Sequence, residues 1–175
     1  MKRVMIADDT KNIRLMLKKF YELEGYQVTL ADNGADTLSI LLKETFDLIM
    51  LDIKMPVMSG TEVLRQIRKA KIKTPVIVMT AYGTIRNAVE TTNLGAVCYL
   101  QKPFTIDKMQ KILTQLNEDN VLSALDEQLK SIKLNIADNQ YQTAMDKLKI
   151  LLKEHTLDSE IYHLLSVTKL CNGKL

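Results

Sequence analysis

Short apolar runs alternate with amphipathic stretches five times in the first two thirds of this 175-residue chain, and this alternation constrains the fold more than any other feature. Apolar runs predict buried strands, and apolar residues at helical spacing predict helices. The expected strands are residues 3–7, 27–31, 47–51, 75–80 and 96–100, and the expected helices are residues 11–24, 34–45, 60–71, 84–93 and 106–117. The third and fourth strands are apolar on both faces, as in a parallel sheet covered by helices. The sequence therefore predicts an α/β fold with a doubly wound parallel (βα)₅ sheet.

Acidic residues follow two of these strands. Asp8 and Asp9 come after the first strand, and Asp52 comes after the third. If the two strands are neighbours, the three carboxylates converge at the carboxyl edge of the sheet, where open α/β sheets bind ligands. Mg²⁺ would relieve their repulsion, and in proteins it usually joins carboxylates to phosphate oxygens. The cluster therefore indicates phosphoryl chemistry, although Asp8 and Asp9 would serve equally well as the cap and first-turn acid of the next helix.

A hydroxyl and an ammonium follow two further strands at the same expected edge. Thr80 ends the fourth strand, and Lys102 comes shortly after the fifth. A hydroxyl can donate a hydrogen bond to a phosphoryl oxygen, an ammonium can neutralise developing charge, and a carboxylate can act as nucleophile. Together with the acids, these residues indicate a site that receives a phosphoryl group.

Several short segments occur in a characteristic order along the first part of the chain. They are Asp8-Asp9, Leu51-Asp52-Ile53-Lys54-Met55-Pro56, Gly60, Thr80-Ala81, Tyr99 and Lys102-Pro103-Phe104. Each segment is weak evidence alone, but their joint occurrence in order is specific. This set resembles the receiver (CheY-like) domain of two-component response regulators, most closely the nitrogen-regulation and sporulation-phosphorelay type. The resemblance covers residues 1–118, which we expect to form a receiver domain with the flavodoxin-like strand order 2-1-3-4-5.

The resemblance implies a role for each acidic residue. Asp52 is expected to be the phospho-acceptor, loaded by a histidine kinase or a phosphotransfer protein. The expected Mg²⁺ ligands are Asp8, Asp9, Asp52 and the main-chain carbonyl of Lys54. The bulk of Lys54 and Tyr82, each two residues past a functional position, is expected to slow hydrolysis of the phosphorylated state.

The resemblance also implies a conformational switch. Thr80 would donate a hydrogen bond to the aspartyl phosphate and Lys102 would pair with it, while Tyr99 occupies the aromatic switch position. Movement of Thr80 toward the phosphate would vacate space for Tyr99 and shift a pre-existing equilibrium. The bond between Lys102 and Pro103 is expected to be cis, because proline is nearly the only residue that tolerates a cis peptide.

One face of the first predicted helix is a candidate docking surface for the phosphodonor protein. Ile13, Leu17, Phe20 and Tyr21 keep helical spacing and are expected to face the core. Asn12, Arg14 and Leu15 are then expected on the exposed side near the acids, where they either bind a kinase or are simply solvated.

Residues 121–175 have a different character and predict a small all-α region. Apolar residues at helical spacing predict helices at residues 121–137, 141–153 and 158–171. Tyr141, Ala144 and Leu148 resemble the second helix of a tetratricopeptide repeat, but the period is poorly sustained. We expect either a truncated helical-repeat output region that binds a protein partner or a generic helical hairpin that forms a homodimer.

Charge and composition exclude other classes of protein. The helical region carries seven lysines and seven acidic residues, with no basic stripe, so direct DNA binding is not expected. No apolar run is long enough for a membrane span, and a cytoplasmic location is expected. Cys98, Cys171, His155 and His163 lack the spacing of a disulfide framework or a metal site. The alternative function is a magnesium-dependent phosphatase-like α/β enzyme using the same acids, which would need a second acid or base near Asp52.

Overall fold

The structure, a computed structural model, describes residues 1–81, 84–154 and 159–172. The chain divides into two compact units, Met1–Ile112 and Leu113–Leu175. The first unit holds an open sheet with helices on both faces, and the described elements of the second unit are all helices. Tyr82 and His155 lie outside the described residues. The expectation that the bulk of Tyr82 slows hydrolysis therefore concerns a residue that the structure does not describe.

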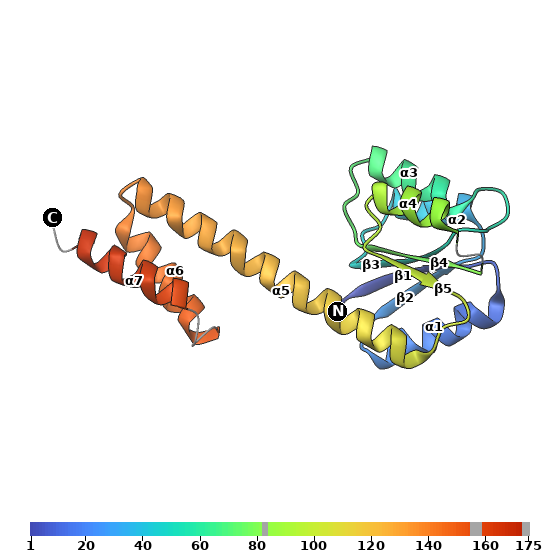
Figure 1. The fold of residues 1–175 in the computed structure, drawn as a ribbon, viewed down its shortest axis with the longest axis horizontal. Helices are drawn as coiled ribbons and strands as arrows, with labels where there is room; N and C mark the ends of the chain where they lie inside the picture. The colour runs from blue at the N-terminus through green and yellow to red at the C-terminus, as the bar shows by residue number, and fades with distance from the viewer. Residues whose placement is uncertain (82–83, 155–158, 173–175) are drawn as a thin grey trace. The chain divides into compact units, whose positions relative to one another are not determined.

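The first unit contains a five-stranded parallel sheet (Figure 1). The strands lie in the order β2-β1-β3-β4-β5, which confirms the predicted doubly wound, flavodoxin-like topology. Their bounds are β1 Arg3–Ala7, β2 Gln27–Ala31, β3 Leu48–Asp52, β4 Val76–Thr80 and β5 Cys98–Gln101. The two central strands β3 and β4 are buried along their whole length, as expected of strands that are apolar on both faces.

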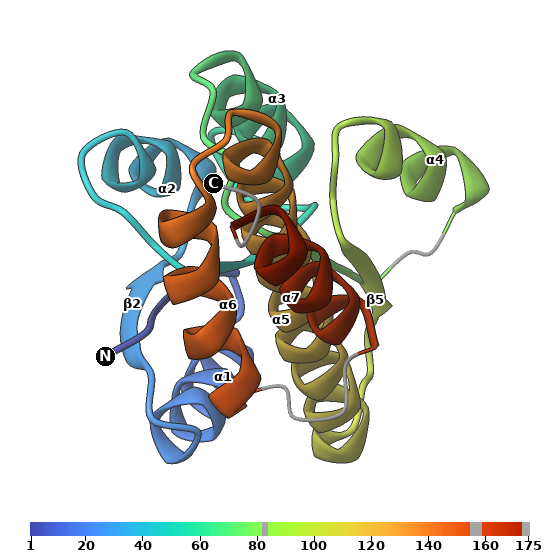
Figure 2. The same cartoon turned by 90° about the vertical axis from the view of Figure 1, so that its left-hand side faces the viewer.

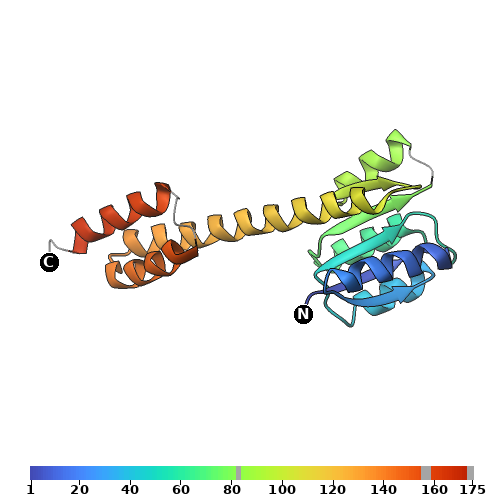
Figure 3. The same ribbon diagram turned by 90° about the horizontal axis from the view of Figure 1, so that it is seen from below.

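Helices cover both faces of the sheet. The first unit contains α1 Lys11–Leu23, α2 Gly34–Leu41, α3 Gly60–Lys69, α4 Ile85–Asn93 and the beginning of α5 Ile106–Ala137. α1 and the first turns of α5 cover one face, and α2, α3 and α4 cover the other (Figures 1 and 3). In α1, Leu17, Phe20 and Tyr21 are buried as predicted. The core between the sheet and the α2–α3 face includes Ile49, Leu51, Val63, Leu64 and Ile67.

Two local features place the end of β3. Ser59 caps α3 by accepting a hydrogen bond from the main-chain N–H of Glu62 at 3.3 Å. A Cβ atom on Gly60 would lie 1.9 Å from the carbonyl oxygen of Asp52, so only glycine permits this close approach. The N–H of Gly60 also donates to the carbonyl of Ile53 at 2.9 Å. The start of α3 is therefore held directly against the carboxyl end of β3.

The second unit is built from the later part of α5 with α6 Tyr141–Glu154 and α7 Ser159–Asn172. α6 and α7 lie side by side (Figure 2). Three helices share one aliphatic core, whose buried members are Leu129, Ile132, Ala144, Leu148, Leu151, Ile161 and Leu164. This core accounts for the apolar spacing that predicted the helices.

The predicted break between two helices at residues 117–120 is wrong. The structure has a single helix, α5, from Ile106 to Ala137. The segment Asn-Glu-Asp-Asn is polar but contains neither glycine nor proline, and asparagine and aspartate reduce helix propensity only modestly. Polarity alone is therefore a poor signal for a helix end.

Among the described residues, no helix is both long enough and apolar enough to cross a lipid bilayer. Cys98 on β5 and Cys171 on α7 are both free thiols. Cys98 is half-buried, and burial raises the pKa of its thiol. These observations agree with a packing role for the two cysteines.

Candidate functional site

Three carboxylates meet at the carboxyl edge of the sheet. One ligand oxygen from each of Asp8, Asp9 and Asp52 lies within 4.8 Å of the others. Parallel pairing of β1 with β3, in which Ala7 lies beside Leu51, brings the residues that follow these strands together. Asp8 and Asp52 are buried, whereas Asp9 is exposed. The sheet register therefore produces the convergence that the sequence predicted.

Lys102 reaches the same cluster from the loop after β5. Its Nζ lies 2.6 Å from Oδ2 of Asp8 and 3.0 Å from Oδ2 of Asp52. Its main-chain N–H donates to the carbonyl of Thr80 at 2.7 Å, which ties this loop to the end of β4. The bond from Lys102 to Pro103 is cis, as predicted. One ammonium thus sits between two buried carboxylates.

Asp52 and Asp8 each bury one carboxylate oxygen that accepts no hydrogen bond among the described residues. Burial raises the pKa of the Asp52 carboxyl above the ordinary value, and hydrogen bonding and charge from Lys102 act in the opposite direction. The negative charge of Asp8 raises this pKa further, while the main-chain N–H of Lys54 lowers it. Oδ1 of Asp52 is buried and has no hydrogen-bond partner among the described residues. A buried carboxylate oxygen beside two other acids is suited to an oxygen-seeking dication such as Mg²⁺.

Hydrogen bonds fix the loop that carries Asp8 and Asp9. Oδ1 of Asp8 accepts from the main-chain N–H of Thr10 at 2.9 Å. Nη1 of Arg14 donates to the main-chain carbonyls of Asp8 at 2.7 Å and Asp9 at 3.0 Å. Nη2 of the same guanidinium lies 3.8 Å from the carboxylate of Asp32. This cation holds the backbone that presents two of the three acids.

The expectation that Arg14 is exposed for docking is wrong. Its side chain is only 15% exposed and is turned toward the β1–α1 loop. Asn12 and Leu15, its neighbours on α1, are exposed. Sequence reasoning missed the supporting role of Arg14. A sequence signal that could have predicted this role is an arginine in the first turn of the helix that follows an acidic strand end.

The remaining expected residues surround the cluster at different depths. Thr80 is buried at the end of β4, one residue past the position that pairs with Asp52. Tyr99 is half-buried on β5 and packs against the core. Lys54 is exposed in the loop after β3.

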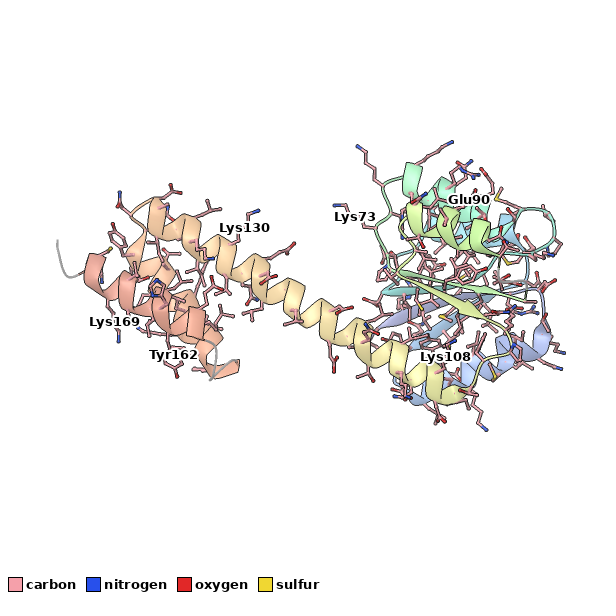
Figure 4. All side chains as sticks on the ribbon, in the orientation of Figure 1. Lys73, Glu90, Lys108, Lys130, Tyr162 and Lys169 are labelled. Atoms are coloured by element: carbon pink, nitrogen blue, oxygen red, sulfur yellow. The ribbon has the colours of Figure 1, made fainter. Side chains whose placement is uncertain are left out.

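An open groove of about 650 Å³ leads to the acids from the side of α3 and α4. Asp9 and Lys54 line its inner end, and Arg65, Asn87 and Glu90 line its outer part. Arg65 on α3 lies 2.7 Å from Glu90 on α4 and also contacts Glu62. Glu90 is labelled on α4 in Figure 4. The exposed member of the acidic cluster is therefore reachable from solvent.

Comparison with known proteins agrees with this geometry. Residues 4–114 match the model of the response regulator receiver domain. Sporulation initiation phosphotransferase F of Bacillus subtilis strain 168 is 40% identical over 108 residues, covering 62% of this chain and 87% of that protein. Regulatory protein AtoC of Escherichia coli K12 is 38% identical over 111 residues, but the chain spans only 24% of its length. Transcriptional regulatory protein DltR of Streptococcus agalactiae serotype III is 31% identical over 156 residues, covering 89% of this chain and 70% of that protein.

Solved structures resemble the first unit. A CheY-like receiver domain protein from Methanospirillum hungatei has a TM-score of 0.64 at 36% identity, over 69% of this chain and 97% of that one. The response regulator TrrA from Thermotoga maritima, solved in complex with Mg²⁺ and BeF, has a TM-score of 0.60 at 37% identity, over 66% of this chain and 99% of that one. Both matches cover nearly the whole of the solved chain.

Proposed function

This chain belongs to the response regulator receiver family, and from that premise we propose that Asp52 accepts a phosphoryl group from a histidine kinase or a phosphotransfer protein. Receiver domains work in two-component signalling, where phosphorylation and Mg²⁺ are general features of the family. The observation that carries the assignment is the unpartnered, buried Oδ1 of Asp52 beside the ammonium of Lys102. Such an oxygen is available to attack phosphorus.

Asp8 and Asp52 each have one buried oxygen without a hydrogen bond among the described residues, but that oxygen of Asp8 lies 2.6 Å from the ammonium of Lys102, which favours Asp52 as the nucleophile. Asp8 uses Oδ1 to accept from Thr10 and Oδ2 to contact Lys102. Asp52 contacts Lys102 through Oδ2 and leaves Oδ1 without a donor among the described residues. Attack by this oxygen would form a phosphorus–oxygen bond as the phosphorus–nitrogen bond of phosphohistidine breaks, with the electron pair left on the imidazole nitrogen.

The acids fit a magnesium site. Asp8, Asp9, Asp52 and the main-chain carbonyl of Lys54 would hold Mg²⁺ in this proposal. When bound, the ion would neutralise the carboxylates and the phosphoryl oxygens, so that anionic donor and anionic acceptor can approach each other. Asp9 is the exposed member and borders the open groove, so it offers a route of entry for the ion.

Lys102 and Thr80 would bind the phosphoryl group that is added to Asp52. The ammonium of Lys102 already lies between two carboxylates, so a phosphoryl group on Asp52 gives it a stronger partner. Thr80 would donate its hydroxyl hydrogen to a phosphoryl oxygen, and Tyr99 would move with it as the switch residue. The resulting population shift would change the binding of a partner protein. The output would pass through the helical tail, residues 121–175.

Mass spectrometry after incubation with acetyl phosphate and Mg²⁺ tests the acceptor. We expect one added phosphoryl group on the parent chain and none on Asp52→Asn. Asp126→Asn is the matched control, because this exposed acid of α5 lies in the second unit, and it should be modified like the parent. Equal modification of Asp52→Asn would place the acceptor elsewhere.

A turnover assay separates this function from the phosphatase-like alternative. The residue two positions past Asp52 is Lys54 rather than an acid, and it is exposed. A receiver should be modified once and release little product from a general phosphate ester, whereas a phosphatase would release many equivalents per chain.

The expected absence of DNA binding stays a prediction, since DltR is named as a transcriptional regulatory protein. Titration with labelled duplex DNA would test it.

A further inference from the structure

A small groove with one cation lies in the second unit, between α5 and α6. Gln128, Ser131 and Ile132 line it from α5, and Lys147, Ile150 and Leu151 line it from α6. Its volume is about 270 Å³, less than a typical pocket for a drug-sized ligand. Ile132 and Leu151 belong to the buried core, whereas Ile150 is 60% exposed. The groove therefore combines an apolar floor with an apolar side chain at its open edge.

The ammonium of Lys147 is paired only with neutral groups among the described residues. Its Nζ donates to Oγ of Ser131 at 2.9 Å and to Oδ1 of Asn135 at 2.7 Å. The amide nitrogen of Asn135 donates to Oε1 of Gln140 at 2.7 Å, which fixes the oxygen of Asn135 toward the lysine. Neutral acceptors orient a cation without neutralising it, so the charge of Lys147 remains available to an anion.

Two other lysines of the same unit differ from Lys147 in having a carboxylate partner. Lys133 lies 2.5 Å from Glu160, and Lys149 lies 3.8 Å from Asp146. No carboxylate is among the described residues that line the groove. Lys147 thus supplies the one charge among the described lining residues, beside three aliphatic side chains, Gln128 and Ser131.

We propose that this groove binds a segment of a partner protein that presents a carboxylate beside an aliphatic side chain. The carboxylate pairs with Lys147, the aliphatic side chain packs on Ile150 and Leu151, and the amide of Gln128 bonds to the main chain of the segment. The groove's size suits one or two side chains of a peptide. This inference rests on the proposed output through the helical tail and names the chemistry of the partner.

A protein partner suits the groove better than a nucleic acid. Nucleic acid binding depends on many lysine or arginine contacts with phosphates, and the described lining offers one cation. The helical region as a whole has equal numbers of lysines and acids. A phosphate backbone offers no aliphatic group to pack on the apolar floor of the groove, whereas a peptide supplies both an acid and an aliphatic side chain.

Selection from a random peptide library on the intact chain tests the proposal. We expect enriched peptides to carry aspartate or glutamate next to leucine, isoleucine or valine. A selected peptide is then synthesised with its acid and with the matching amide, and binding is measured by fluorescence anisotropy. Either Lys147→Gln or the amide peptide should weaken binding about tenfold, the effect of losing one charge-assisted contact. Lys169→Gln, an equal charge change on α7 outside the groove, should bind like the parent (Figure 4).

Further variants protect the test against misfolding. Lys147→Arg should restore most of the binding because it keeps the charge. Ile150→Glu should lower binding, and its exposed position means that it leaves the helical core intact. Circular dichroism checks that each variant keeps its helix content, and modification of Asp52 by acetyl phosphate should remain as in the parent. Loss of peptide binding with intact Asp52 modification thus separates this proposal from the phosphoryl-acceptor assignment.

Three results would overturn the proposal. They are a selection that yields no binding peptide, enriched peptides without acidic residues, and equal binding by Lys147→Gln. Sedimentation of the parent supplies a further check. A dimer that Lys147→Gln dissociates would make a second copy of this chain the occupant in place of another protein.

Discussion

The two units of this molecule bury different kinds of side chain. In the first unit, Asp8, Asp52 and Thr80 are buried at the edge of the sheet, and two carboxylates share one ammonium. In the second unit, the described buried residues are apolar except for Thr168, whose hydroxyl donates to the carbonyl of Leu164 at 2.6 Å. The first unit therefore retains buried charges, whereas the buried hydroxyl of the second unit is hydrogen-bonded within its own helix.

This difference separates packing from chemistry. Burying a carboxylate without full compensation costs stability, so the cluster in the first unit is not explained by packing, and the proposed phosphoryl and Mg²⁺ site would account for it. The aliphatic core of the second unit needs no explanation beyond burial of apolar surface. Its function is therefore to be sought on its surface, at groups such as Lys147.

Truncation of the helical core should give the largest change in stability. Leu148 is fully buried between helices, so Leu148→Ala should destabilise the second unit by about 2–5 kcal/mol through lost contacts and a cavity. Urea denaturation followed by circular dichroism measures the loss, with exposed Ile150→Ala as control. Acetyl phosphate should still modify Asp52. Loss of that modification would show that the two units depend on each other for folding.

Removal of the Arg14 guanidinium should give the next largest effect. Arg14→Met deletes two charged hydrogen bonds to main-chain carbonyls and should destabilise the first unit by about 2 kcal/mol. Mg²⁺ affinity, measured by isothermal titration calorimetry, should also fall because the loop bearing Asp8 and Asp9 is less fixed. Lys19→Met, an exposed change on α1, is the control. An unchanged Mg²⁺ affinity would restrict Arg14 to a purely structural role.

Magnesium should stabilise one unit only. A ligand at ten times its dissociation constant adds about 1.4 kcal/mol to the free energy of unfolding when it binds the native state alone. We expect this gain for the transition of the first unit and none for the second, measured by urea titration at matched ionic strength. Asp9→Asn should reduce the gain, and because Asp9 is exposed the variant should fold. An equal gain in both units would contradict a site at the sheet edge.

The ion pair between Lys133 and Glu160 should matter least. Both side chains are about half exposed, so Lys133→Gln should cost under about 1 kcal/mol, and added salt should shrink the difference further. Lys130→Gln, a change on the same helix, is the control (Figure 4). Thermal unfolding at low and high salt measures both. A loss that salt does not reduce would show that Lys133 contributes by packing.

The parallel strands and the acidic cluster were predictable from sequence for a physical reason, whereas the strand order came from the resemblance to receiver domains. Buried parallel strands must be apolar on both faces, so residues 48–51 and 76–79 are visible as continuous runs. The carboxyl ends of such strands meet at one edge, so Asp8, Asp52 and Thr80 could be placed together before any coordinates were known.

Features that depend on three-dimensional contacts were not predictable. The continuity of α5 through residues 117–120 contradicts a prediction based on polarity. The inward turn of Arg14 depends on carbonyls five and six residues earlier in the chain, and helical spacing had placed it on the exposed side. Lys147 meets Ser131 and Asn135 across a helix pair, which no local pattern reveals.

The close approach of Gly60 to Asp52 has a further consequence. Because Gly60 has no side chain, the backbone of α3 can approach the carbonyl oxygen of Asp52 to a distance that no other residue would allow. The opening turn of α3 thereby sets the position of Asp52, the proposed acceptor, at the end of β3. Even the smallest replacement, alanine, would therefore be expected to displace Asp52 relative to Asp8, Asp9 and Lys102 without removing any charge.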